Sequence, residues 1–146
     1  MARDLSIAGY ANSALLAATT ITTAVTAVVT TPVADLLGMQ VLTLLAKFVY
    51  GSAGTNATAW VQTSFDGGVT WVDIACFQFT TATASKINSV RALTAVAADY
   101  TPTDGTLTAN TIKDGILGDR LRVKYTTTGT YAGGTTLAIF AVAKGS

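Results

Sequence analysis

Residues 120–125 read RLRVKY, the clearest alternation of polar and apolar residues in the chain. On an extended backbone Leu121, Val123 and Tyr125 point to one side, and Arg120, Arg122 and Lys124 point to the other. A period of two is typical of a strand that lies with one face on an apolar core and the other on a polar surface. The stretch therefore predicts a half-buried strand of an antiparallel sheet.

Further strands are expected on both sides of this one. Residues 41–50 are apolar on both faces, which indicates burial on two sides, in a sandwich or at a subunit contact. Residues 57–64 and 69–79 flank an Asp-Gly-Gly turn and predict a hairpin, and residues 135–143 predict a closing strand. Residues 85–97 predict a weaker strand pair, or a strand and a loop.

Composition favours the same class of fold. The 146 residues include 27 Thr and 25 Ala, with no Glu, and only 12% are charged. Abundant Thr and Val with few charges favour sheet over surface helix. We expect an all-β chain, an antiparallel β-sandwich of jelly-roll-like or immunoglobulin-like type, over residues 21–146. Residues 1–20 are expected to form an N-terminal arm or a short helix.

The N-terminal stretch from Leu5 to Ala34 carries no charge and is long enough to span a bilayer. Its many Thr residues and the lack of a flanking basic cluster disfavour a membrane span. A short helix or extended arm over residues 6–18 and a strand over residues 21–33 are the preferred interpretation. Such an arm is suited to lie along a neighbouring subunit.

Missing residue types exclude several kinds of chemistry. The chain has no His and one Cys, and its formal net charge is +1. Catalytic pairs that use His, zinc sites that contain His, and internal disulfides are therefore excluded. A net charge near zero also argues against a nucleic-acid footprint. We expect a non-enzymatic protein without cofactor or metal, and with neither nucleic acid nor membrane as a partner.

The acidic residues permit two weaker hypotheses. Asp66 and Asp73 flank Trp71, an arrangement that would suit glycoside hydrolysis on a Trp platform. Four more acids fall in a turn-rich loop over residues 99–119, where they could offer oxygen ligands to calcium: Asp99, Asp104, Asp114 and Asp119. Most of these acids stand beside Gly or in Pro-containing turns, so solvated turn carboxylates are the preferred interpretation.

The stretch SFDGGVTW at residues 64–71 resembles the Asp box of sialidase-like propellers. The resemblance implies a structural turn in which Asp66 accepts backbone N–H bonds, Gly68 supplies an unusual backbone angle, and Trp71 packs beneath the hairpin. Ser64 belongs to the same turn. The motif occurs once and predicts a hairpin, not a glycosidase.

Two sets of residues are candidates for an interface. Arg120, Arg122 and Lys124, here called the basic stripe, form either a solvated face that protects an edge or a surface that pairs with an acidic partner. Tyr100 and Tyr131 lie in expected loops and could anchor a contact. Trp60 and Trp71 are expected in the core, and Cys76 as a buried, small apolar residue.

The stretches at residues 60–75, 118–125 and 128–131 are similar to small virion proteins of tailed bacteriophages, which are Ala-, Thr- and Gly-rich and poor in Cys and His. The resemblance implies a sandwich domain that is repeated many times in a head, neck or tail. We expect a capsid decoration or cement protein that forms homo-oligomers and contacts the major capsid protein. The alternatives are a neck or tail protein, and a carbohydrate-binding or host-attachment module that uses exposed aromatic residues.

Overall fold

The computed structural model describes residues 13–30, 34–36 and 38–145. None of these residues lies in a helix, which confirms the prediction of an all-β chain. The strands are β1 (Ser13–Thr20), β2 (Val28–Val29), β3 (Ala34–Asp35), β4 (Val41–Val49), β5 (Ser52–Ala53), β6 (Asn56–Ser64), β7 (Val72–Phe79), β8 (Ala84–Arg91), β9 (Arg120–Thr128), β10 (Tyr131–Ala132) and β11 (Thr136–Lys144).

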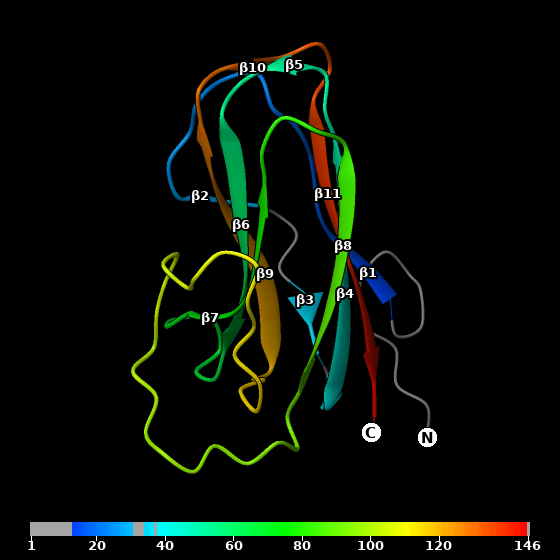
Figure 1. Cartoon of the computed structure of the whole chain (residues 1–146). Helices are drawn as coiled ribbons and strands as arrows, with labels where there is room; N and C mark the ends of the chain where they lie inside the picture. Colours follow the sequence, from blue (N-terminus) through cyan, green and yellow to red (C-terminus); the bar gives the residue numbers. More distant parts are fainter. Residues whose placement is uncertain (1–12, 31–33, 37, 146) are drawn as a thin grey trace.

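The long strands form two antiparallel sheets that lie face to face (Figure 1). Sheet A has the strand order β1-β11-β4-β8, and sheet B has the order β2-β9-β6-β7, with β3 also paired to β9. A short pair, β10 with β5, lies at the upper end of the sandwich in Figure 1. The buried side chains of sheet A and sheet B share one hydrophobic core, so the chain forms a β-sandwich.

The connections decide between the two expected types of sandwich. When the short strands β2 and β3 are counted as one interrupted strand of sheet B, successive strands alternate between the sheets, and only the β6–β7 hairpin joins paired neighbours within one sheet. Two four-stranded antiparallel sheets connected in this way form a jelly roll. An immunoglobulin-like fold would instead place its first two strands in one sheet.

Side chains alternate along the strands as the sequence predicts. On β4 the residues Leu42, Leu44, Ala46 and Phe48 are buried between the sheets, while the residues between them face outward. On β9 the inward residues are Leu121, Val123 and Tyr125, and the basic stripe faces outward. The polar and apolar halves of these strands thus occupy the faces that their spacing indicates.

Aromatic rings fill the core near β10. Phe48 stacks on Phe79 with ring centroids 5.0 Å apart, and Tyr131 meets Phe48 edge-on at 5.6 Å. The Tyr131 hydroxyl donates a hydrogen bond of 2.7 Å to the carbonyl of Thr80. The expectation that Tyr131 is an interface anchor is therefore wrong, because its ring is only 1% exposed and closes the end of the core.

A β-bulge in β7 places Asp73 on a different face of sheet B from the one that strict alternation predicts. Alternation alone places Asp73 on the same face as Ala75 and Phe77. In the structure Val61 pairs with Ala75 while the next residue, Gln62, pairs with Asp73. The extra residue in β7 turns Asp73 to the outer face of sheet B, whereas Phe77 stays in the core.

The N-terminal expectations are corrected in two places. Ser13–Thr20 form β1, which pairs with β11 along its length, so these residues belong to sheet A and are not part of an arm or helix. Of the strand expected over residues 21–33, Val28–Val29 are in a strand, and residues 31–33 lie outside the described part. The first twelve residues of the arm expected over residues 1–20 also lie outside it. No described helix is long and apolar enough to cross a membrane.

Removing the central core ring should destabilise the fold strongly. We expect Phe48→Ala to lower the free energy of unfolding by about 3–5 kcal/mol, because it leaves a cavity between Phe79 and Tyr131. The matched control is Phe140→Ala, whose ring lies on the outer face of sheet A and should cost under about 1 kcal/mol. Urea unfolding of both variants measures the difference, and equal losses would contradict this placement of the core.

Candidate functional site: the outer faces of the two sheets

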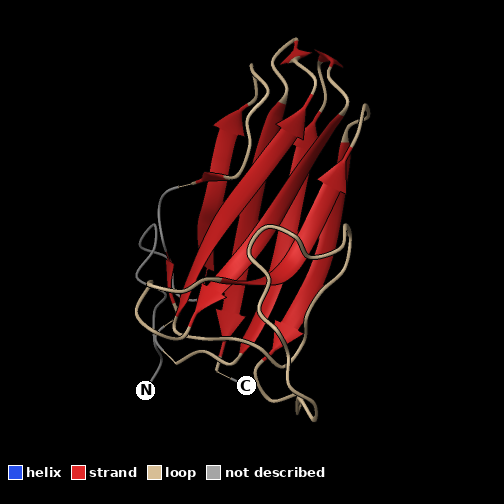
Figure 2. Ribbon diagram, turned by 90° about the vertical axis from the view of Figure 1, so that its left-hand side faces the viewer, coloured by secondary structure: helices blue, strands red, loops and turns tan. Residues whose placement is uncertain are grey.

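The two sheets differ in what covers their outer faces. The long loop, residues 92–119, lies along the edge of β7 and across the outer face of sheet B (Figure 2). The amide of Cys76 donates to the carbonyl of Thr111 at 2.9 Å, and the indole N–H of Trp60 donates to the carbonyl of Leu107 at 3.0 Å. The loop therefore satisfies polar groups of sheet B that would otherwise face water.

A buried carboxylate anchors the long loop. Asp73 is fully buried and accepts hydrogen bonds from the amides of residues 105, 106 and 107 at 2.8–3.1 Å. The hydroxyl of Thr103 and the side-chain amide of Gln62 also donate to it, at 2.9 and 2.8 Å. Because its oxygens accept from so many protein groups, this carboxylate anchors the long loop to sheet B.

The basic stripe finds its acidic partner within the same chain. The ammonium of Lys124 and the guanidinium of Arg122 both approach Asp104 of the long loop, the latter at 3.8 Å. Partial burial alone would raise the pKa of Asp104, but hydrogen bonds from Lys124 and Gln62 outweigh it, and that pKa is lowered. Arg120 is exposed, so of the three it is the residue that remains available to an outside partner.

Arg122 of the basic stripe also covers the ring of Trp71. The guanidinium of Arg122 lies 4.3 Å from the centre of the Trp71 ring, and the indole N–H donates to the carbonyl of Gly68 at 3.0 Å. Trp71 is 9% exposed, although it lies on the outer face of sheet B and not between the sheets. A sugar would have to displace Arg122 to stack on this ring.

The residues of the Asp-box-like stretch come together in one turn. The carboxylate of Asp66 accepts from the amide of Thr70 at 2.7 Å and from the hydroxyl of Ser64 at 2.9 Å. Ser64 in turn accepts from the amide of Gly68, whose φ of 96° suits glycine. The hydrogen bonds from Thr70, with that from Ser64, lower the pKa of Asp66 to about 2.

Tyr100 and Cys76 have separate surroundings. The half-buried ring of Tyr100 lies under the ammonium of Lys113 at 4.3 Å, and its hydroxyl is 3.2 Å from that of Thr103. Tyr100 thus belongs to the long loop and lies partly at the surface. Cys76 is fully buried, as expected, and burial raises the pKa of its thiol to about 11.

The loop acids do not converge. Asp104 pairs with Lys124, whereas Asp114 accepts from the amide of Arg91 at 2.7 Å and from the hydroxyl of Thr94 at 2.8 Å. Within the described ranges, no three residues of the types His, Cys, Asp and Glu form a group that could hold a metal ion. Of the four acids that the calcium hypothesis grouped by sequence, Asp104 and Asp114 thus serve separate contacts, and Asp99 and Asp119 are exposed.

The outer face of sheet A carries a cluster of exposed and half-buried apolar side chains, which we call the sheet-A patch. Cross-strand pairing aligns Phe140 of β11, Leu45 of β4 and Ile87 of β8 in one row. The patch consists of Val41, Leu45, Val49, Ile87, Phe140 and Val142. Ile87 is 70% exposed, and no described segment lies over the row. Contiguous exposed apolar surface of this kind marks an interaction site.

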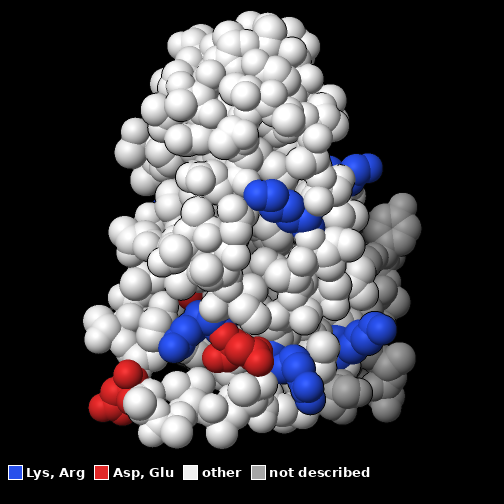
Figure 3. Space-filling model, viewed as in Figure 1, with Lys and Arg blue, Asp and Glu red and all other residues white. Residues whose placement is uncertain are grey.

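Charge differs between the two sheets as well. The four strands of sheet A contain four cations and no carboxylate: Lys47, Lys86, Arg91 and Lys144. In the view of Figure 3, acidic and basic side chains gather near the lower end of the molecule, further basic side chains lie near its middle, and the upper end around β5 and β10 shows none. The sheet-A patch is therefore an apolar area with positive charge on its own sheet and no negative charge.

Some of these features could be found in the sequence and others could not. The two apolar faces of residues 41–50 already indicated burial on both sides, in a sandwich or at a subunit contact. Nothing in the spacing indicated that Asp104 would pair with the basic stripe, because the two are joined only by the path of the long loop. Ile87 was not singled out, since its strand has weak alternation.

Comparisons of this chain with protein-family models, curated proteins and solved structures find no match.

Changing the buried carboxylate should release the long loop. In Asp73→Asn an amide N–H₂ replaces an acceptor oxygen that faces several donors, and we expect a loss of about 2–3 kcal/mol in the free energy of unfolding. Hydrogen exchange should become faster at residues 105–107 and stay slow in β4 and β11. The exposed Asp99→Asn is the control. Unchanged exchange at residues 105–107 would show that Asp73 does not hold the loop.

The Asp66 turn should weaken in acid. Because the pKa of Asp66 is lowered from 3.8 to about 2, its contribution to stability is complete above about pH 4 and is lost as the pH falls towards 2. Carboxyl NMR titration should give a midpoint near 2 for Asp66. Ser64→Ala should raise that midpoint only in part, since the Thr70 amide still donates. A midpoint at 3.8 in the unaltered protein would refute the turn's role.

Proposed function

We propose that this protein is a non-enzymatic structural subunit of a bacteriophage virion, a decoration or cement protein that binds the capsid shell through the sheet-A patch. The observation that carries the proposal is the row Phe140–Leu45–Ile87, which is apolar and faces away from the subunit's own core. A stable partner surface over this row would remove it from water. The resemblance of the sequence to small virion proteins points to the shell as that partner.

The charges around the patch describe the surface that would fit it. Lys47 and Lys144 lie on the outer face of sheet A, and Arg91 lies at its β8 edge. Since the strands of sheet A have no carboxylate, a complementary surface has an apolar centre with Asp or Glu around it. Such a contact would weaken with added salt without being lost, because its centre is apolar.

The fold is compatible with this function but does not distinguish it from the main alternative. Jelly rolls occur in viral capsid proteins and also in lectins, so the topology alone does not separate the two. A carbohydrate-binding module would need an accessible aromatic platform. Trp71 lies beneath Arg122, and Trp60 donates its indole N–H to the long loop. These contacts favour the structural role, whether in the head or in a neck or tail.

A charge placed in the patch should abolish shell binding. The test is cosedimentation of the purified protein with shells assembled from the major capsid protein encoded in the same genome. We expect the unaltered protein to sediment with the shells and Phe140→Lys to lose at least about tenfold in affinity, the effect typical of a central interface residue.

Phe65→Lys is the matched control, because Phe65 is 61% exposed but lies at the tip of the β6–β7 hairpin. It should bind shells as well as the unaltered protein does. The proposal fails if the unaltered protein stays in the supernatant, or if Phe140→Lys binds shells equally well.

A further inference from the structure

Strand β8 has one edge without a partner. Its other edge pairs with β4, from Ala84 to Arg91. The amide of Arg91 donates to the carboxylate of Asp114, and the carbonyl of Arg91 accepts from the amide of Gly115. Both backbone groups of Arg91 therefore point away from β4. In an antiparallel sheet these groups alternate in direction along the strand. The amides and carbonyls of Ser85, Ile87 and Ser89 therefore face the same open edge, and among the described residues they have no hydrogen-bond partner.

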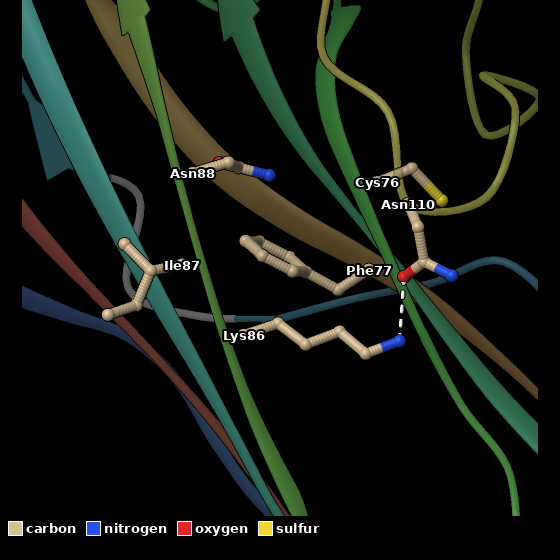
Figure 4. A pocket seen from close by; sticks show the side chains of 6 residues that line it. All are labelled: Cys76, Phe77, Lys86, Ile87, Asn88 and Asn110. Atoms are coloured by element: carbon tan, nitrogen blue, oxygen red, sulfur yellow. Dashed lines mark hydrogen bonds between the residues drawn. The ribbon is translucent and has the colours of Figure 1, made fainter.

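The neighbouring edge, on β7, is closed by side chains. The amide of Gln78 donates to Asn110 at 3.0 Å, and the ammonium of Lys86 donates to the carbonyl of Gln78. Lys86 also donates to Asn110 at 2.9 Å across a pocket of about 320 Å³ (Figure 4). A lysine commonly protects a strand edge, but this one reaches across to β7. It leaves the backbone of its own strand open.

We propose that β8 pairs with β8 of a second copy of this chain, antiparallel and centred on Ile87. In this register Ile87 lies opposite Ile87 of the second copy, and Ser85 lies opposite Ser89. The three residues with open backbone groups then meet only one another, which allows six new backbone hydrogen bonds by the antiparallel pattern. A two-fold axis through Ile87 makes the contact self-complementary and closed.

The charges favour this register. Lys86 falls opposite Asn88, and Arg91 falls opposite Thr83, just beyond the start of the strand. No cation therefore lies directly opposite another, which would destabilise the pair. The neutral rungs at residues 85, 87 and 89 have exposed side chains in the single subunit. The new ladder ends at Ser89, because the edge groups of Arg91 are already bonded to Asp114 and Gly115.

Pairing would join the sheet-A patches of two subunits. The row Phe140–Leu45–Ile87 would continue through Ile87 of the second copy into its own Leu45 and Phe140, across six strands. The inference does not depend on the proposed function, because it rests on the open edge alone. An edge contact of about five residues is smaller than a standard interface, so we expect a weak and reversible dimer.

The first test is sedimentation equilibrium from about 10 μM to about 1 mM, a range that spans weak association. We expect the unaltered protein to dimerise and Ile87→Pro to stay monomeric. Proline at this position removes an amide N–H that has no partner within the subunit, and an edge strand tolerates it. Ile87→Val keeps the N–H and should dimerise. Dimers of equal strength in Ile87→Pro would overturn the proposal.

A second test remains valid if Ile87→Pro does not fold. Residues paired in this register have Cα atoms about 5.5 Å apart, within reach of a disulfide. Under mild oxidation Ile87→Cys should form covalent dimers at least about tenfold faster than Val69→Cys, whose site is 83% exposed at the hairpin. The native Cys76 is buried and should not compete.

Equal rates for the two cysteine variants, or a protein that stays monomeric throughout, would overturn the pairing. Phe140→Lys separates this inference from the proposed function. It should lose shell binding while its β8 edge still forms dimers, since Phe140 lies two strands away from that edge.

Discussion

A two-layer sandwich can bury only one face of each sheet between its layers, and this constraint governs the rest of the molecule. Strands β4 and β11 carry apolar residues on both faces, so packing the inner faces leaves the outer ones still apolar. The chain covers the outer face of sheet B with the long loop. Sheet A has no such cover among the described residues, and Phe140 and Ile87 lie exposed there. The apolar outer surface of sheet A thus stays exposed because the long loop lies on sheet B.

The cover on sheet B depends on one buried carboxylate. Asp73 reaches the outer face because of the bulge in β7, and there it collects the amides that begin the second half of the long loop. The same loop brings Asp104 to Arg122 and Lys124, which neutralises much of the basic stripe. Polar groups on sheet B are therefore satisfied within the subunit. The apolar surface left uncovered in the described structure lies on sheet A.

Much of the framework follows from local alternation of side chains. The strands expected at residues 41–50, 57–64 and 135–143 agree with β4, β6 and β11 to within one or two residues. Alternation also placed Leu121, Val123 and Tyr125 in the core. These predictions succeed because the period of a strand is a local property of the chain.

Other features depend on tertiary structure that no short stretch of sequence specifies. The N-terminal strand β1 has an Ala- and Leu-rich sequence without alternation, and pairing with β11 makes it a strand. The face of Asp73 depends on a bulge against β6, and the burial of Tyr131 depends on Phe48 from a distant strand. Residue types and turns were thus predictable, whereas the partners of Asp73, Asp104 and Tyr131 were not.

If the protein binds the capsid shell as we propose, the sheet-A patch is covered in the bound state. Hydroxyl-radical footprinting compares the reactivity of individual side chains in free protein and in protein bound to shells. We expect binding to protect Phe140, Leu45 and Val142 strongly. The reactivity of Phe65 and Val69 at the β6–β7 hairpin should stay unchanged. Protection confined to the hairpin or to the long loop, with Phe140 as reactive as in the free subunit, would contradict it.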